Sequence, residues 1–224
     1  MIKQHLIITF LISFSTMLIA QVPVREEPRH KPVFENKYIR VLDVWIQPGD
    51  TSLYHVHDTP SLFVAFENTL IGNQLLGSEP VMDKFESGQT WYDSFAKPKT
   101  HRVWNRDKSP VHVDDIEILT NAPASLSDTN KLLTFKLLGD YQKARTYNLN
   151  LSPNENLTFT INQNPIVIFS YKGRVDVKDS SATKNLTEHS VKKGSFQWID
   201  QGSTVILKNQ DNDNMNGYIY EIKQ

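Results

Sequence analysis

The sequence predicts an all-β protein, and three observations support this fold class. Many short segments alternate apolar and polar residues or are rich in β-branched residues, and Gly, Pro, Asn and Asp separate them. Only residues 124–138 are compatible with a short helix, and Leu132 to Leu138 within that range fit a strand equally well. A weak internal repeat then divides the chain into two β modules.

The expected strands fall into two sets of similar spacing, which is typical of β sandwiches and barrels. In chain order they are Tyr38 to Ile46, Leu53 to His57, Leu62 to Phe66, His101 to Asn105, Val111 to Leu119, Thr146 to Leu151, Leu157 to Ile161, Ile166 to Tyr171, Thr204 to Asn209 and Tyr218 to Ile222.

The first twenty residues have the pattern of a secretory signal peptide. Lys3 supplies a positive charge, and Leu6 to Ala20 is an apolar run broken only by Thr and Ser. This run is shorter than the roughly 20 residues that a membrane helix needs. We therefore expect residues 1–20 to be removed and the mature chain to be periplasmic or secreted. An uncleaved anchor and a buried strand are the alternatives.

The repeat has an offset of about 105 residues. It consists of matching turn residues and matching apolar positions rather than of many identical residues. Arg40 aligns with Arg145, Pro48 with Pro153 and Pro60 with Pro165, and at an offset of 104 Asn105 aligns with Asn209. We expect an N-terminal module over 21–125, a linker over 126–130 and a C-terminal module over 131–224. The alternative is one larger sandwich with coincidental spacing. The recurring arginine favours a repeated structural salt bridge over substrate binding.

Composition restricts the chemistry. The 224 residues include no cysteine, and 24 Lys and Arg oppose 25 Asp and Glu, so the net charge is −1. A disulfide framework and a thiolate metal site are therefore excluded, and any metal must be held by histidine and oxygen ligands. Nearly balanced charge argues against nucleic acid as a partner, because phosphate binding needs concentrated Lys and Arg.

Three histidines form a pattern with chemical meaning. His55 and His57 lie two residues apart in SLYHVHD, so both side chains point to the same face of a strand. His101 lies on a later expected strand, in THRVWN. Because buried imidazoles need hydrogen-bond partners or a metal, we predict His55, His57 and His101 as metal ligands. Hydrogen-bonded barrel histidines without a metal are the alternative.

These residues resemble the two motifs of the cupin superfamily. Pro48 and Gly49 precede, after five residues, the His55-Val56-His57 triplet, and Gly88 is followed by His101 and, after three intervening residues, Asn105. The resemblance extends from about Glu27 to Gln224. It implies a bicupin, with two small jelly-roll β-barrels in tandem.

The chain departs from the cupin pattern in both modules. Ser61 and Leu62 stand where the resemblance implies a metal-binding Glu, so the site consists of three neutral histidines, with Asp93 or Glu67 open as a further ligand or base. The family's Pro-x-Gly turn before His101 lacks its Pro and Gly, and its loop is longer. In the second module, the alignment replaces the histidines by Thr160, Asn162 and Val205. We therefore expect a degenerate C-terminal barrel without this metal site.

Three neutral imidazoles suit a divalent transition metal such as Fe, Zn, Mn, Ni or Cu. Because these ligands add no negative charge, such a centre favours an anionic chelating ligand. The resemblance implies an oxygenase, an isomerase or a sugar-acid converting enzyme as one hypothesis. The alternatives are a non-catalytic bicupin that binds a small molecule or glycan, and a scaffold protein.

The expected partner is a small anionic or carbohydrate-derived ligand, without nucleic acid and without a stable membrane span. A homodimer is left open. Lys97, Lys99 and Arg102 form a basic cluster beside His101. Ordinary solvated charges are one interpretation of this cluster, and steering of an anion into a barrel mouth is the other.

Overall fold

A computed structural model describes residues 21–121, 132, 134–181 and 184–224. The elements of the N-terminal half are β1 (Gln21–Pro23), a 3-10 turn η1 (Val24–Glu26), β2 (His30–Glu35), β3 (Ile39–Ile46), β4 (Tyr54–His57), β5 (Ser61–Ala65), β6 (Thr69–Leu75), β7 (Val81–Phe85), β8 (Thr90–Asp93), β9 (Lys99–Asn105) and β10 (Val111–Ile118). Those of the C-terminal half are β11 (Lys136–Asp140), β12 (Ala144–Leu151), β13 (Asn156–Thr160), β14 (Ile166–Lys172), β15 (Arg174–Ser181), β16 (Lys184–Lys192), β17 (Ser195–Ile199), β18 (Thr204–Lys208) and β19 (Met215–Ile222).

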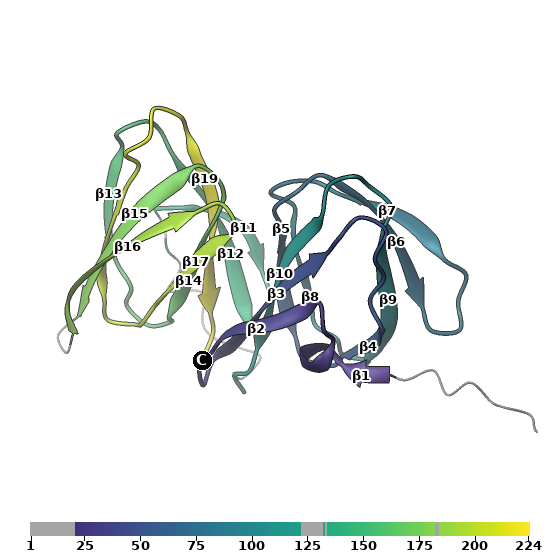
Figure 1. Cartoon of the computed structure of the whole chain (residues 1–224). Coiled ribbons are helices and arrows are strands. Elements are labelled where there is room, and N and C mark those ends of the chain that lie inside the picture. The colour runs from purple at the N-terminus through teal and green to yellow at the C-terminus, as the bar shows by residue number, and fades with distance from the viewer. Residues whose placement is uncertain (1–20, 122–131, 133, 182–183) are drawn as a thin grey trace, which may run out of the picture.

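The strands form two jelly-roll barrels of the cupin type, each made of two sheets. The first barrel has sheets of order β1-β4-β9-β6-β7 and β2-β3-β10-β5-β8. The second has sheets of order β13-β18-β15-β16 and β11-β12-β19-β14-β17, which follow the same connectivity. Figure 1 shows the two barrels side by side, the first in purple to teal and the second in green to yellow. The predicted all-β fold is confirmed.

Each expected strand is present within a few residues of its predicted bounds. The strands without a sequence prediction include β6, β7, β15 and β16. All four carry many polar or exposed side chains, and only β15 shows a short apolar alternation, at Val175 and Val177. Within the range 124–138 the described residues contain the start of β11 rather than a helix. The predicted signal peptide and the predicted linker lie outside the described residues. Among the described residues no helix is long and apolar enough to cross a membrane.

The repeat is visible in two buried side-chain networks. The amide of Asn105 donates hydrogen bonds to the carbonyls of Ile46 and Ser109, and that of Asn209 donates to those of Leu151, Ser152 and Asp213. Both asparagines thus fasten the same strand end to the same two loops, because buried backbone carbonyls must find donors.

The aligned arginines are structural, as predicted. Arg40 Nη1 lies 2.6 Å from Glu117 Oε2, and Arg145 Nη1 lies 3.3 Å from Glu221 Oε2. In both barrels the glutamate is on the central strand beside the arginine's own strand. The ion pair therefore recurs at the same place in each copy.

The pairing of strands corrects our alignment of the histidines with the second module. In the first barrel Thr51 bridges to Trp104, whereas His55 faces His101. From Thr51 to His55 the chain advances by four residues, whereas from Trp104 back to His101 it advances by three. The segment before β4 therefore contains one extra residue relative to its partner strand. The corresponding ladder of β13 and β18 runs without a shift.

Phe159 and Ile161 therefore correspond to His55 and His57, and the predicted matches Thr160 and Asn162 were wrong. Phe159 faces Val205 as His55 faces His101, so Val205 remains the match to His101. A step of one residue moves a side chain to the opposite face of a sheet. Thr160 and Asn162 are accordingly exposed.

Apolar side chains fill the interior of the second barrel. Phe159, Ile161 and Val205 are all buried members of one cluster that also includes Leu149, Ile168 and Ile219. The positions that hold imidazoles in the first barrel are thus part of a hydrophobic core in the second.

The sheet β2-β3-β10-β5-β8 of the first barrel packs face to face against the sheet β11-β12-β19-β14-β17 of the second, and we call this packed layer the seam. Its buried apolar residues are Ile39, Val41, Leu62, Val64, Phe66, Ile116 and Ile118 from the first barrel and Ala144, Val167, Phe169, Tyr218, Tyr220 and Ile222 from the second. Tyr220 Oη and Thr90 Oγ1 lie 2.7 Å apart across it. Each fully buried aliphatic or aromatic side chain contributes about 1.5–3 kcal/mol, so the seam holds the barrels together.

We predict that Asn209→Ala lowers the free energy of unfolding by about 2 kcal/mol, because three backbone carbonyls lose the buried amide that donates to them. Urea denaturation measures this change. Asn212→Ala, at an exposed position of the neighbouring loop, is the matched control and is expected to change stability little. Equal stability of the two variants would contradict the role of Asn209.

Candidate metal centre

Strands β4 and β9 bring the three predicted histidines together inside the first barrel. His55 and His57 share the inner face of β4, and His101 is the cross-strand neighbour of His55. The ring centroids are 4.6 Å apart for His55 and His101, 5.0 Å for His55 and His57, and 5.1 Å for His57 and His101. The three predicted rings thus adjoin one another, but the histidines whose ligand atoms all lie within 4.8 Å of one another are His30, His55 and His57, and metal binding by the predicted set stays a prediction.

Hydrogen bonds orient two of the rings. His55 Nδ1 donates to the Leu53 carbonyl at 3.0 Å, and His101 Nδ1 donates to the Asn73 side-chain oxygen, also at 3.0 Å. Each Nδ1 therefore carries the proton, and each Nε2 keeps its lone pair. Both Nε2 atoms are buried without a partner. A ring oriented by its other nitrogen, with a free lone pair directed into a cluster, is the usual arrangement of a histidine metal ligand.

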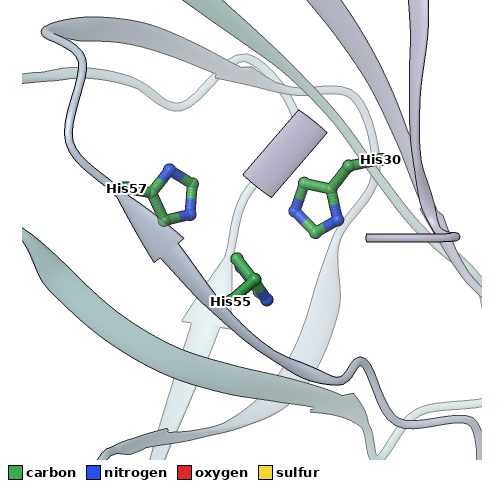
Figure 2. A group of neighbouring side chains, drawn as sticks. All are labelled: His30, His55 and His57. Atoms are coloured by element: carbon green, nitrogen blue, oxygen red, sulfur yellow. The ribbon is translucent and has the colours of Figure 1, made fainter. Parts of the chain in front are cut away.

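A fourth histidine, His30, adjoins the cluster and was not identified from the sequence. Its ring centroid lies 4.5 Å from that of His55, and the ligand atoms of His30, His55 and His57 are all within 4.8 Å of one another. Figure 2 shows these three rings grouped around a common space. His30 precedes the first expected strand, so no spacing links it to the other histidines in sequence.

Glu27 positions His30. The carboxylate accepts hydrogen bonds from His30 Nδ1 at 2.8 Å and from the backbone amides of Arg29 and Leu53. Burial opposes ionisation of this carboxyl, but these hydrogen bonds outweigh it and lower the pKa of Glu27 to about 2. Glu27 is thus a buried anion that holds the His30 ring in place.

Asp115 places a second carboxylate beside the histidines. Its Oδ2 lies 3.4 Å from His57 Nδ1, and both carboxylate oxygens are buried without a hydrogen bond. An unpartnered buried carboxylate is unfavourable unless a cation or a proton offsets it. The sequence prediction of a centre with neutral ligands therefore omitted an acidic neighbour on β10.

The environment keeps two of the imidazoles neutral. Burial, with smaller contributions from the rings of His30 and His57, lowers the pKa of His55 to about 3. Burial and the rings of His55 and His57 also lower the pKa of His101. Neutral imidazole is the form that binds metal ions.

Four residues bear on the missing Glu: Ser61 and Leu62 stand at its expected position, and Asp93 and Glu67 are the possible replacements. Ser61 is buried and donates to the Thr59 carbonyl, and Leu62 belongs to the seam. Glu67 pairs with Lys193 on the surface, whereas Asp93 lines the cavity next to the histidines.

A cavity of about 260 Å³ opens beside His57 and His101. Its wall combines apolar and aromatic side chains with polar and charged ones, and several rings stack on one another, including Phe63 on Trp91. The lining residues are His57, Phe63, Ile71, Asn73, Asp83, Phe85, Gln89, Trp91, Asp93, Phe95, Lys99, His101 and Val103.

The predicted basic cluster is divided by the fold. Lys99 lines the cavity and is the strand partner of His57. Lys97 is exposed, and Arg102 lies over the Tyr54 ring and donates to Gln74 on the outer face. Only Lys99 among these three residues faces the site.

We predict that Glu27→Gln destabilises the metal-free protein by about 2 kcal/mol at neutral pH, because the buried hydrogen bonds lose their anionic acceptor. The folded-state pKa is depressed, so this contribution is complete above pH 4.5 and is lost as the pH falls toward 2. Denaturation at several pH values measures it, with the exposed neighbour variant Glu26→Gln as control. A difference independent of pH would contradict the assignment.

No protein-family model matches the sequence, and no curated protein matches it. Solved structures resemble the fold. AerE from Microcystis aeruginosa is 12% identical with a TM-score of 0.61, covering 88% of this chain and 99% of AerE. An oxalate decarboxylase from Lactobacillus farciminis, in complex with formate, is 9% identical with a TM-score of 0.58, covering 84% and 78% of the two chains.

Procruciferin, an 11S globulin from Brassica napus, is 8% identical with a TM-score of 0.58, covering 84% of this chain and 76% of procruciferin. The similar structures thus include an enzyme and a globulin. At these identities the likeness establishes the cupin-type fold of two barrels and leaves function to the residues of the site.

Proposed function

We propose that this chain is an exported metal-binding bicupin whose N-terminal barrel binds a small chelating anion at a divalent transition metal. One observation carries the proposal. The buried Nε2 atoms of His55 and His101 have no partner, and their ring centroids lie 5.0 Å and 5.1 Å from that of His57. Free imidazole lone pairs at this density suit Fe, Zn, Mn, Ni or Cu.

His55, His57 and His101 would hold the metal, with His30 as an additional imidazole in place of the missing Glu. Glu27 fixes His30, Leu53 fixes His55 and Asn73 fixes His101, so most of the donor set is oriented before any metal arrives. Asp115 supplies negative charge beside it. This combination fits a divalent cation better than four neutral imidazoles alone, because the carboxylate offsets part of the buried charge.

The cavity defines the class of ligand. The aromatic and aliphatic parts of the wall accommodate an apolar body, and Lys99 is the basic residue among lining residues that also include Asp83 and Asp93. A carboxylate with an adjacent hydroxyl or keto oxygen and a small apolar or sugar-like body therefore fits best. The likeness to an oxalate decarboxylase complexed with formate, a small carboxylate, is compatible with this class.

If the protein is an enzyme, the bound metal supplies Lewis-acid polarisation of the chelating oxygens. The chain itself contributes Lys99 to bind the carboxylate, Asp115 to accept a proton inside the barrel, and the aromatic wall to exclude water. Oxygenase, isomerase and sugar-acid conversion remain the candidate reaction types.

The second candidate is a non-catalytic binding protein on the same site. The likeness to a globulin, and a second barrel with Phe159, Ile161 and Val205 at the histidine positions, favour it. Turnover separates the two. The metal-loaded protein is incubated with a panel of 2-hydroxy and 2-oxo acids while oxygen uptake and product mass are followed. Tight binding of one acid without any product supports the binding protein.

We predict that His55→Ala/His57→Ala and His101→Ala each bind one equivalent of transition metal fewer than the wild type. Mass spectrometry of tag-free protein measures the metal content. His189→Ala, at an exposed position on β16, is the matched control and keeps the wild-type content. Unchanged metal content in both site variants would overturn the proposal.

We predict that Lys99→Met weakens binding of a 2-hydroxy or 2-oxo acid by about tenfold, because the carboxylate of the bound acid loses its charged partner. Calorimetric titration of the metal-loaded protein measures the affinity. Lys97→Met removes an equal charge two residues away at an exposed position and is expected to bind as the wild type does. Equal weakening in both variants would indicate general charge attraction instead of a contact in the cavity.

A further inference from the structure

A second group of metal-binding side chains lies in the seam, on the opposite face of the sheet from the histidine cluster. Asp43 on β3 and Asp114 on β10 are direct cross-strand partners. His112 lies two residues before Asp114, so its side chain is on the same face. Asp115, the next residue along β10, points to the other face of the sheet, into the barrel, and contacts His57.

The ligand atoms of the three side chains lie near one another. One ligand atom from each of Asp43, His112 and Asp114 lies within 4.8 Å of the other two. His112 Nε2 and Asp43 Oδ1 are 3.1 Å apart. Two ligand atoms that each lie about 2.1 Å from a metal, at right angles to one another, are about 3.0 Å apart. The contact between His112 and Asp43 therefore has the spacing of two neighbouring metal ligands.

Asp114 is the unusual member of this group. It is 2% exposed, and its carboxylate makes no hydrogen bond and no ion pair with any residue that the structure describes. Its cross-strand partner is another aspartate, and like charges directly opposite one another destabilise a sheet. A buried carboxylate in this position is unfavourable unless a cation or a proton offsets it.

The nearby lysines do not supply that cation. Lys31 is the strand partner of Asp43 on β2, but it is exposed and forms no ion pair with Asp43. Lys193, beside the seam, pairs with Glu67 at 2.7 Å. Within the described residues, His112 is the one basic side chain in contact with this pair of carboxylates, through Asp43.

His112 is held firmly from both barrels. Its ring stacks on Trp45 at 3.8 Å and lies 4.5 Å from the ring of Phe66. On the other side it packs against Gly194, where an added Cβ would lie 2.6 Å from His112 Cε1. Gly194 also has a φ of +74°, a conformation that favours glycine. The second barrel therefore fixes the imidazole that the first barrel contributes.

From this geometry we infer that Asp43, His112 and Asp114 form a second divalent-cation site, which stabilises the seam between the two barrels. Two carboxylates and one imidazole suit a divalent transition metal such as Zn²⁺ or Mn²⁺. The cation takes the place of the proton between His112 Nε2 and Asp43 Oδ1 and neutralises the opposed aspartates. Asp43 is partly exposed, so the ion and its water ligands reach the site from the edge of the seam.

The test is the Zn²⁺ stoichiometry of the full, tag-free chain after dialysis, measured by mass spectrometry. The seam variant is Asp43→Asn/Asp114→Asn, which keeps the side-chain shape and removes the opposed charges. The expected result is one equivalent fewer than the wild type, and a melting temperature that Zn²⁺ raises less. Glu26→Gln/Glu79→Gln removes two exposed carboxylates and is the matched control.

This site is tested independently of the histidine centre. On a His55→Ala/His57→Ala/His101→Ala background, one equivalent of Zn²⁺ is expected to remain and to be lost when the seam substitutions are added. If the triple histidine variant does not fold, the test compares the Zn²⁺ content of the wild type and the seam variant. The shift of the His112 imidazole NMR signals on adding Zn²⁺ to the wild type is the second measurement. Equal Zn²⁺ content in the wild type and the seam variant, or unshifted His112 signals, would overturn the inference.

Discussion

The pairing of β4 with β9 is the constraint on which the candidate site depends. His55 faces His101 only because the first barrel carries one extra residue between the Thr51–Trp104 bridge and the start of β4. In the uninterrupted register Tyr54 would face His101 and both histidines of β4 would point to the outer surface. A local irregularity of a single residue therefore decides which face of the strand carries the chemistry, as is common for irregular strands near functional sites.

The two barrels show what this arrangement costs. The interior of the second is a continuous apolar cluster, in which Phe159, Ile161 and Val205 pack where imidazoles stand in the first. The first contains four histidines, buried Asp115 and Glu27, and a cavity of about 260 Å³. Buried polar groups without partners are unfavourable. The same strand order is thus used once for packing and once for a site whose polar atoms require a ligand.

The seam gives the second barrel a role beyond its own core. It covers the outer face of β3, β10 and β5 with Val167, Phe169, Tyr218 and Tyr220, and it places Gly194 against His112. Strand β10 is shared by both environments, since its side chains alternate between the barrel interior and the seam. Asp115 and Asp114 are adjacent in sequence, yet they serve the histidine cluster and the seam cluster respectively.

The fold class could be predicted from the amino-acid sequence alone, and so could the ten main strands, the repeated arginine and asparagine positions, and the histidines of β4 and β9. These features depend on residue type and local period, and a residue's neighbours along the chain carry that information. The three-dimensional arrangement was needed to show that His30 and Asp115 join the cluster, that Lys99 faces the cavity while Arg102 does not, and that Phe159 replaces His55. Each of these depends on which strands pair and in what register, and that is set by packing between segments far apart in the sequence.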